Sequence, residues 1–300
     1  MRVNPDLVSG VLAGLQQSQL SLNTALQEVS TGKRVSVPSD DPAASADMVQ
    51  NTIDSKNVDQ YTQNVSSVLS MVQTADSTLS SVVTGLSKAI SLGTEGANGT
   101  TNATDQQSIA TEVQGIISSV VSAANTSYQG SYLFGGTANT QAPYTADATS
   151  ASGYKYNGNS GVNSVAVGDN LTVQANLPGD LIFSNPSNDV LGALSSLVSA
   201  LQSGNTTSIK TATTAVNSAL SYVSQQRVVY GNAETQLNSQ ETYLQQETVT
   251  LTSQATALVG VNMADAATAL AQAQTANSAA LAAASKVLPT TLLNYLAPVQ

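Results

Sequence analysis

Two stretches of the sequence carry apolar residues at every seventh position, and this periodicity constrains the fold more than any other feature. The first repeat runs through Val58, Val65, Val72, Leu79 and Leu86, with a companion set three residues later at Tyr61, Val68, Ala75, Val82 and Ala89. The second runs through Ile209, Val216, Val223, Tyr230, Leu237, Leu244, Leu251 and Leu258. Such spacing forms one apolar stripe along a long helix, and that stripe must pack against other long helices.

The second repeat favours a bundle of several helices over a two-stranded zipper. Its companion positions include Gln226, Gln240 and Glu247, which are too polar for a closed two-helix seam. Gly231 lies inside this stretch and is a candidate for a kink. Arg227, Glu234 and Glu241 follow one another at steps of seven on one helix edge, and they predict a solvated or inter-helix ion-pair edge.

Both ends of the sequence predict further helices that form a pair of terminal arms, over residues 1–40 and 260–300. An apolar stripe near the N-terminus is followed by Gly32, while the C-terminal part is rich in alanine from Ala264 to Leu288. We expect the two chain ends to lie together in an inner coiled coil, and their stripes to be buried by neighbouring copies of the chain. The predicted assembly residues are Val8, Leu15, Leu22, Val29, Leu270, Leu281, Leu288, Leu292 and Leu296.

A turn separates the N-terminal arm from the first long helix. The segment 38–42 reads Pro-Ser-Asp-Asp-Pro, in which Asp41 before Pro42 is typical of an N-cap followed by a first-turn proline. A helix is therefore predicted to begin near residue 42. The alternative is that Asp40 and Asp41 form a carboxylate pair for acid-base chemistry, but the turn already explains both residues.

The segment 128–188 interrupts the helical pattern. It is rich in glycine, asparagine and tyrosine, and its short alternating runs at 163–167 and 171–175 predict strands of an inserted β domain. The helical bundle would then comprise residues 41–127 and 189–259. Residues Tyr128, Tyr132, Tyr144, Tyr154 and Tyr156 are expected to belong to the β structure, with stacking on sugars or bases as the alternative. Because the heptad residues lie outside 137–187, that segment is expected to be dispensable for the role of the protein.

Composition excludes most catalytic chemistry. The chain has no His and no Cys, so it cannot form a Ser-His-Asp or Cys-His nucleophile system, a His-ligated haem or a cysteine-rich metal site. With a net charge of -10 and only 9% charged residues, it has no basic surface for nucleic acid or anionic membranes. We predict a mainly α protein with an inserted small β domain, no enzymatic activity, no cofactor, no metal site, and neither nucleic acid nor membrane as a partner. No apolar run suggests an ordinary secretory signal.

Several short segments of the sequence resemble those of the bacterial flagellin superfamily. They are Ser30-Thr31-Gly32-Lys33-Arg34, Pro38-Ser39-Asp40-Asp41-Pro42-Ala43-Ala44, Ala124-Asn125-Thr126, Gly130-Ser131-Tyr132-Leu133-Phe134-Gly135-Gly136 and Leu292-Leu293-Asn294-Tyr295-Leu296. The likeness covers both helical arms, about residues 1–136 and 189–296, and follows the hook-filament junction branch of the superfamily more closely than flagellin itself. Tyr230-Gly231-Asn232 departs from the pattern, because an arginine is expected near that glycine.

The resemblance implies a mechanical role on the outside of a bacterium. Members pair their terminal helices in an inner tube and are exported unfolded through the flagellar type III apparatus. The implied partners are neighbouring copies of the chain, the first hook-associated protein, flagellin, an export chaperone and the export apparatus. The implied function is a junction adaptor that transmits torque, with a minor flagellin as the alternative.

Overall fold

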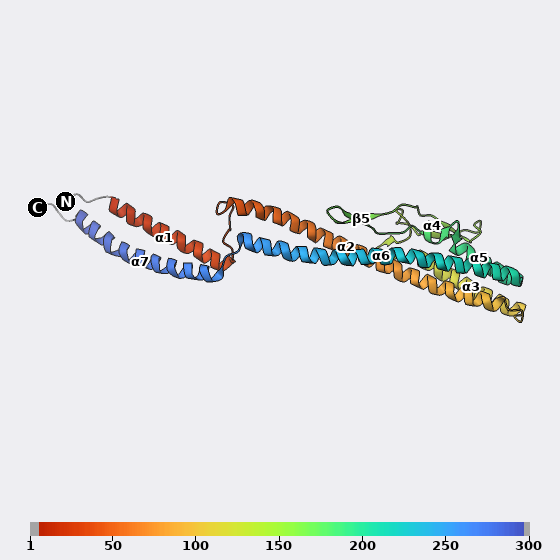
Figure 1. The fold of residues 1–300 in the computed structure, drawn as a ribbon. Helices are drawn as coiled ribbons and strands as arrows, with labels where there is room; N and C mark the ends of the chain where they lie inside the picture. Colours follow the sequence, from red (N-terminus) through yellow and green to blue (C-terminus); the bar gives the residue numbers. More distant parts are fainter. Residues whose placement is uncertain (1–5, 297–300) are drawn as a thin grey trace. The chain divides into compact units, whose positions relative to one another are not determined.

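The computed structural model describes residues 6–296, and the side chains of residues 9–286. It divides into two compact units. Unit 1 comprises residues 1–56 and 248–300, and unit 2 comprises residues 57–247. The chain is mainly helical, as predicted, with small β hairpins between the helices (Figure 1).

The long helices follow the predicted order. They are α1 (Asp6–Thr31), α2 (Pro42–Gly96), α3 (Ala103–Ala124), α5 (Val190–Ser203), α6 (Thr206–Val259) and α7 (Met263–Leu296), with one short helix, α4 (Gly179–Ile182). The strands form antiparallel pairs: β1 (Ser127–Tyr128) with β2 (Ser131–Tyr132), β3 (Tyr144–Ala146) with β4 (Tyr154–Tyr156), β5 (Ser164–Gly168) with β6 (Leu171–Gln174), and β7 (Ser184–Asn185) with β8 (Asn188–Asp189). The helix α6 runs through Gly231 without interruption.

The heptad residues form the core of unit 2, as their spacing predicts. Val65, Val72, Leu79 and Leu86 of α2 are fully buried, and so are Ile209, Val216, Val223 and Leu237 of α6. The helices α3 and α5 pack against one another beside them (Figure 1). With α2, α3, α5 and α6 in one unit, the bundle has more than two helices, which explains why polar companions on α6 are tolerated.

Polar contacts between α2 and α6 supplement the apolar seam. Arg227 donates two hydrogen bonds to the carboxylate of Asp76, both at 2.9 Å. Two turns further along α6, Glu234 accepts a hydrogen bond of 3.1 Å from the amide of Gln73. The predicted charged edge is therefore an inter-helix edge over these residues.

The ends of the helices are closed by the residues that the sequence suggests. The carboxylate of Asp41 accepts a 3.1 Å hydrogen bond from the backbone N–H of Ala44, so it caps α2 at the predicted position. Asn102 caps α3 in the same way, through the N–H of Asp105. Between α5 and α6 the chain reverses at Gly204, whose φ of 67° lies in the left-handed region that favours glycine.

The hairpins of unit 2 surround a small aromatic core. Phe134 and Phe183 are fully buried and meet edge-on with ring centroids 5.3 Å apart, and Tyr144 packs against Phe183 at 5.9 Å. The hydroxyl of Tyr144 donates to the carbonyl of Gly179 at 2.8 Å. Burial raises the pKa of this tyrosine. These rings are thus core residues of the β structure, which agrees with the first interpretation of the tyrosines.

The insert is also bonded directly to the long helices. The hydroxyl of Tyr230 on α6 accepts a 3.1 Å hydrogen bond from the N–H of Leu177, and Tyr222 donates to the carbonyl of Leu181 at 2.9 Å. Leu177 is itself buried. Heptad spacing did not reveal these contacts, because Tyr230 occupies a heptad position with its ring while its hydroxyl lies against the insert.

Candidate assembly interface

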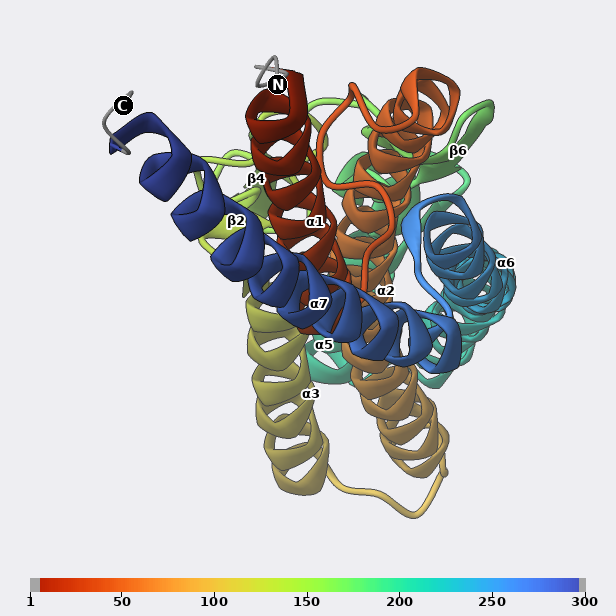
Figure 2. The same cartoon turned by 90° about the vertical axis from the view of Figure 1, so that its left-hand side faces the viewer.

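The predicted assembly residues lie on α1 and α7, which pack against each other in unit 1 (Figures 1 and 2). We call this helix pair the arm. Its less exposed positions alternate at steps of three and four on both helices, as in a coiled coil. They are Val11, Leu15, Ser18, Leu22, Ala25 and Val29 on α1, and Ala266, Leu270, Ala273, Asn277, Ala280 and Ala284 on α7. Alanine at so many positions lets the two helices approach closely but leaves little apolar area to bury.

The predicted residues do not all occupy one face of the arm. Leu15, Leu22, Val29 and Leu270 are half-buried in the seam between the two helices, whereas Leu281 is 52% exposed. Val8, Leu288, Leu292 and Leu296 lie outside the residues whose side chains are described. Residues of the heptad stripe therefore hold the arm together, and most of them have limited surface left for a neighbouring copy.

A second group of apolar residues on the arm faces solvent, although spacing alone puts Leu12 and Leu26 in one stripe with Leu15 and Leu22. These residues are Leu12, Leu20, Leu26 and Leu281, with exposed fractions of 46%, 61%, 45% and 52%, and we call them the outer stripe. Leu12 and Leu26 are two heptads apart and stand beside the seam residues in the sequence.

Other exposed apolar residues of unit 1 extend this pattern. Val49 and Ile53 lie one turn apart on α2 and are 62% and 48% exposed, and Val249 on α6 is 63% exposed. Unit 1 is the smaller unit, yet it holds most of the exposed large apolar side chains of the described residues. Contiguous exposed apolar surface is typical of interaction sites, so these residues are candidates for one.

Two polar atoms are buried in the arm without a partner. They are Oγ of Ser18 and Oδ1 of Asn277, which lie on the seam positions of α1 and α7. An unpaired buried polar atom costs about 1–3 kcal/mol. Together with the alanine-rich seam, this makes the arm a weakly held pair of helices.

The loop between α1 and α2 packs against the end of α6 within unit 1. The chain leaves α1 at Gly32, with a φ of 67°, and the N–H of Arg34 donates to the carbonyl of Val259 at 2.8 Å. The guanidinium of Arg34 bonds both Asp41 at 3.1 Å and the carbonyl of Leu258 at 3.2 Å. Beneath the loop, Val35, Ala44 and Val259 form a small apolar cluster with Met48 and Leu258.

The two aspartates of this loop are structural. Asp40 accepts hydrogen bonds from the N–H groups of Val37 and Ser36, which hold the pKa of its carboxyl below its usual range. The pKa of Asp41 is lowered by the N–H of Ala44 and then by Arg34. Each carboxylate is thus stabilised in its charged form, which is the opposite of a pair that shares a proton. This supports the turn interpretation over the carboxylate-pair alternative.

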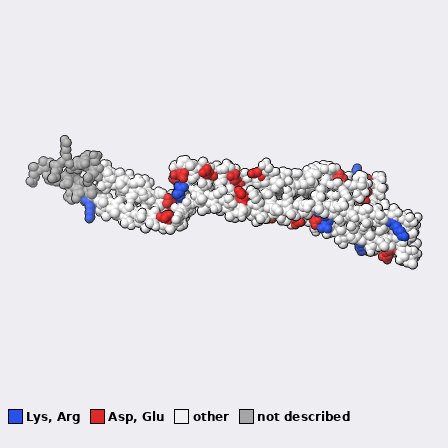
Figure 3. Space-filling model, viewed as in Figure 1, with Lys and Arg blue, Asp and Glu red and all other residues white. Residues whose placement is uncertain are grey.

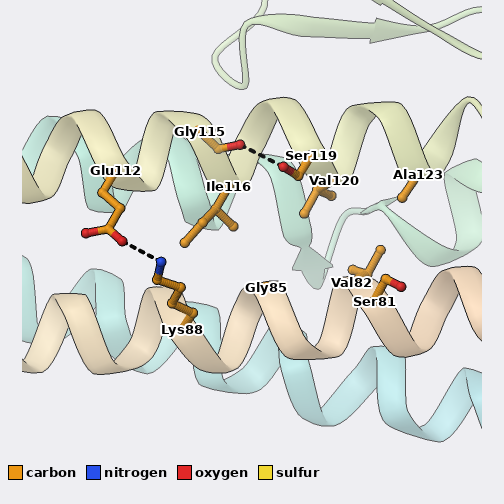
Figure 4. A pocket seen from close by; sticks show the side chains of 10 residues that line it. All are labelled: Ser81, Val82, Gly85, Lys88, Glu112, Gly115, Ile116, Ser119, Val120 and Ala123. Atoms are coloured by element: carbon orange, nitrogen blue, oxygen red, sulfur yellow. Dashed lines mark hydrogen bonds and ion pairs between the residues drawn. The ribbon is translucent and has the colours of Figure 1, made fainter.

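A groove with a mainly apolar lining lies between α2 and α3 in unit 2 (Figure 4). Its volume is about 470 Å³, and Gly85, Gly115 and Ile116 contribute to its floor and walls. At one end Lys88 and Glu112 form an ion pair of 2.5 Å. Both partners are about half exposed, so the pair adds little stability. The groove arises because glycines stand where two helices face each other.

The described residues offer little charge for other kinds of site. Most atoms on the face drawn in Figure 3 belong to uncharged residues. Among the residues that the structure describes, no three His, Cys, Asp or Glu side chains gather as metal ligands would. In the same part of the chain, no helix combines the length and apolar content that a membrane span needs.

The family is identified by two matches that coincide with the helical regions. Residues 8–139 match the model for the bacterial flagellin N-terminal helical region, and residues 213–296 match that for the bacterial flagellin C-terminal helical region. The chain belongs to the bacterial flagellin family. Its N-terminal match covers α1, α2 and α3, and its C-terminal match covers most of α6 and all of α7. This is a family of structural flagellar proteins, not of enzymes.

Individual members of the flagellin family align with part of the chain. The flagellar hook-associated protein 3 of Escherichia coli strain K12 is 34% identical over 138 residues, which are 45% of this chain and 43% of that protein. The flagellin of Salmonella muenchen is 31% identical over 99 residues, 33% of this chain and 20% of that protein. The aligned part thus spans less than half the length of these relatives.

The fold itself is shared more widely. The structure of a flagellar hook-associated protein from Vibrio parahaemolyticus superposes with a TM-score of 0.66, covering 72% of this chain and 98% of that one at 21% identity. At this identity the likeness concerns the fold alone. The fold of this chain is therefore similar to that of a solved flagellar protein.

Proposed function

We propose that the chain is a subunit of the hook-filament junction, a structural adaptor that joins the hook side of a flagellum to the flagellin filament and transmits torque between them. Two observations together support this proposal. The chain belongs to the flagellin family, and the outer stripe of its arm leaves apolar side chains exposed to solvent. The longer alignment with a hook-associated protein 3 than with a flagellin favours the junction over a filament subunit.

The partners follow from this role. Neighbouring copies of the chain would pack their arms side by side, with Leu12, Leu20 and Leu26 at the contacts. The first hook-associated protein would lie on one side of the layer and flagellin on the other. Delivery would need an export chaperone and the flagellar type III apparatus, and the mature location would be extracellular.

The alternative is a minor flagellin, and the two roles differ in how far the chain polymerises. A filament subunit adds to copies of itself without limit, whereas an adaptor has two unlike faces and stops after a short layer. The structural feature common to both is the arm. Self-assembly therefore separates the two roles, while disruption of the arm does not.

The deciding experiment labels isolated flagella with an antibody against the chain and examines a deletion strain. A junction subunit gives one band of label between hook and filament, and its deletion leaves hooks that release flagellin into the medium. In solution the purified protein should not extend seeds of its own. Labelling along the filament, or full-length filaments in the deletion strain, would assign the minor flagellin role instead.

A further inference from the structure

The seam between α2 and α6 has a repeat that does not by itself define its register. Apolar residues recur every seven positions on both helices, for example Val65 and Val72 against Leu237 and Tyr230. A slide of one heptad, about 10 Å along the axis, would again place apolar residues against apolar residues. Register in such a seam must be specified by polar contacts that fit in one position only.

One such contact is the pair of Arg227 with Asp76 described above. The hairpin β5–β6 supplies further contacts, from both helices at once. The side-chain amide of Asn64 on α2 donates to the carbonyl of Ala166 at 2.8 Å, and that of Gln240 on α6 donates to the carbonyl of Val167 at 2.9 Å. The inter-helix pairs on either side, Gln73 with Glu234 and Asn51 with Leu251, place Asn64 opposite Gln240. Two facing amides thus bind two successive carbonyls of one strand.

A bulge in the hairpin makes this geometry possible. Ala166 pairs with Thr172 and Gly168 pairs with Leu171, so Val167 has no partner in the ladder. Its carbonyl is therefore available to Gln240, and its side chain is fully buried. Gly168 lets the amide approach, because a Cβ there would lie 3.1 Å from Nε2 of Gln240.

Neighbouring side chains orient the clamp. The amide of Gln60 donates to Oδ1 of Asn64 at 3.0 Å, which fixes that oxygen and directs Nδ2 to the hairpin. One turn before Asn64, the hydroxyl of Tyr61 donates to the carboxylate of Asp169 in the hairpin turn at 3.1 Å. The hairpin is thereby held at its strand and at its turn.

We infer that the β5–β6 hairpin is a register clamp that stops α2 and α6 from sliding along each other. Asn64 and Gln240 are its positioning residues, and Val167 anchors it in the core. A slide of either helix separates its amide from the carbonyl it binds, while the apolar seam alone would tolerate the new position. The clamp is a property of the monomer, and only its purpose under torque rests on the proposed function.

The test uses the absence of cysteine from the sequence. Cysteines are introduced at Gln73 and Glu234 to report the native register, and in a second protein at Gln73 and Glu241 to report a slide of one heptad. Every protein in the test also carries Arg227→Met, because the pair of Arg227 with Asp76 would otherwise hold the register by itself. A short bismaleimide then links whichever pair is close. In the otherwise unchanged chain only the first pair should react.

The clamp is released by Asn64→Asp with Gln240→Glu, which keep the shape of both side chains and remove both donors. The released protein should link the 73–241 pair, and amide exchange in both helices beside the hairpin should quicken about tenfold. The control carries Gln63→Glu with Gln245→Glu, exposed neighbours on the same helices that add the same charge. It should behave as the unchanged chain.

A second variant guards against misfolding of the first. Gly168→Val leaves both helices unaltered and displaces the amide of Gln240, so it should give the same 73–241 link. If the hairpin amides exchange faster in either variant while the 73–234 pair alone still reacts, the hairpin does not set the register and the inference is wrong. Both readouts use the purified monomer, so they are independent of where the protein lies in a flagellum.

Discussion

Tyr230 shows how one residue can serve two parts of a fold. Its ring occupies a heptad position in the bundle and is 3% exposed, while its hydroxyl accepts the N–H of Leu177. Burial raises the pKa of the hydroxyl, so it stays protonated well above the pH at which exposed tyrosines ionise. The residue therefore couples the packing of α6 to the position of the insert.

Removing that hydroxyl should destabilise unit 2. Tyr230→Phe keeps the ring but leaves the buried N–H of Leu177 without an acceptor, which costs about 1–3 kcal/mol. Denaturant unfolding of the purified chain measures the loss. Tyr243→Phe on the same helix, at a site 59% exposed, is the control and should change the free energy of unfolding little. Equal effects of the two substitutions would contradict the role assigned to the hydroxyl.

The charge on Asp41 should stabilise unit 1 in a pH-dependent way. Its folded pKa lies below the usual 3.8, so the stabilisation is fully present above that value and is lost as the pH falls through the lowered pKa. Asp41→Asn keeps a capping side chain and removes the charge. It should lower the melting temperature at neutral pH, and the difference should vanish in strong acid. Asp47→Asn, in the same helix, is the control; a difference that persists at low pH would show that charge is not the cause.

At the scale of elements, the arm combines a weak inner seam with an apolar outer stripe. Substitutions in the seam and in the outer stripe should therefore have opposite effects, even at neighbouring residues. Leu15→Asp places a charge in the seam and should open the arm in the monomer, which faster amide exchange over α1 would report. Leu12→Asp, on the outer stripe, should leave exchange unchanged but block incorporation into flagella. Normal incorporation of the Leu12 variant would remove the outer stripe from the interface.

The unpaired hydroxyl of Ser18 gives a further test of the seam. Ser18→Ala removes a buried polar atom that has no partner, so the arm should gain about 1 kcal/mol. Amide exchange over residues 11–29 should slow accordingly. Ser30→Ala, at an exposed site of the same helix, corrects for the higher helix propensity of alanine. A gain no larger than that of the control would mean that Ser18 is satisfied by solvent.

Helices and their ends could be predicted from the sequence because periodicity and capping act locally. Heptads located α2 and α6, and Asp41 with Pro42 located the start of α2. The division of apolar residues between seam and outer stripe could not be predicted, since Leu12 and Leu15 differ only in which side of α1 meets α7. The clamp could not be predicted either. A bulge leaves the carbonyl of Val167 free to bind Gln240, and no residue type in the sequence indicates that bulge.

At the scale of the whole molecule, the insert is part of the mechanical body of unit 2. Replacing residues 137–187 with a Gly-Ser linker removes the buried Leu177, Ile182 and Phe183, and leaves the hydroxyl of Tyr230 unpaired. We expect a large loss of thermal stability and a broadened unfolding transition, measured by circular dichroism. An unchanged melting temperature would restore the view that the insert is a separate decoration.

The pairing of α1 with α7 also dictates the order in which the chain can fold. The contacts that close unit 1 join Arg34 to Leu258, 224 residues further along the chain, so they form only after almost the entire polypeptide is available. Closing a loop of this length is slow and entropically costly, whereas α2 and α3 meet through a short turn. Residues 6–31 therefore remain without their helical partner until the last segment arrives. The segment that forms α1 is synthesised long before α7, yet it can pair only once α7 is present.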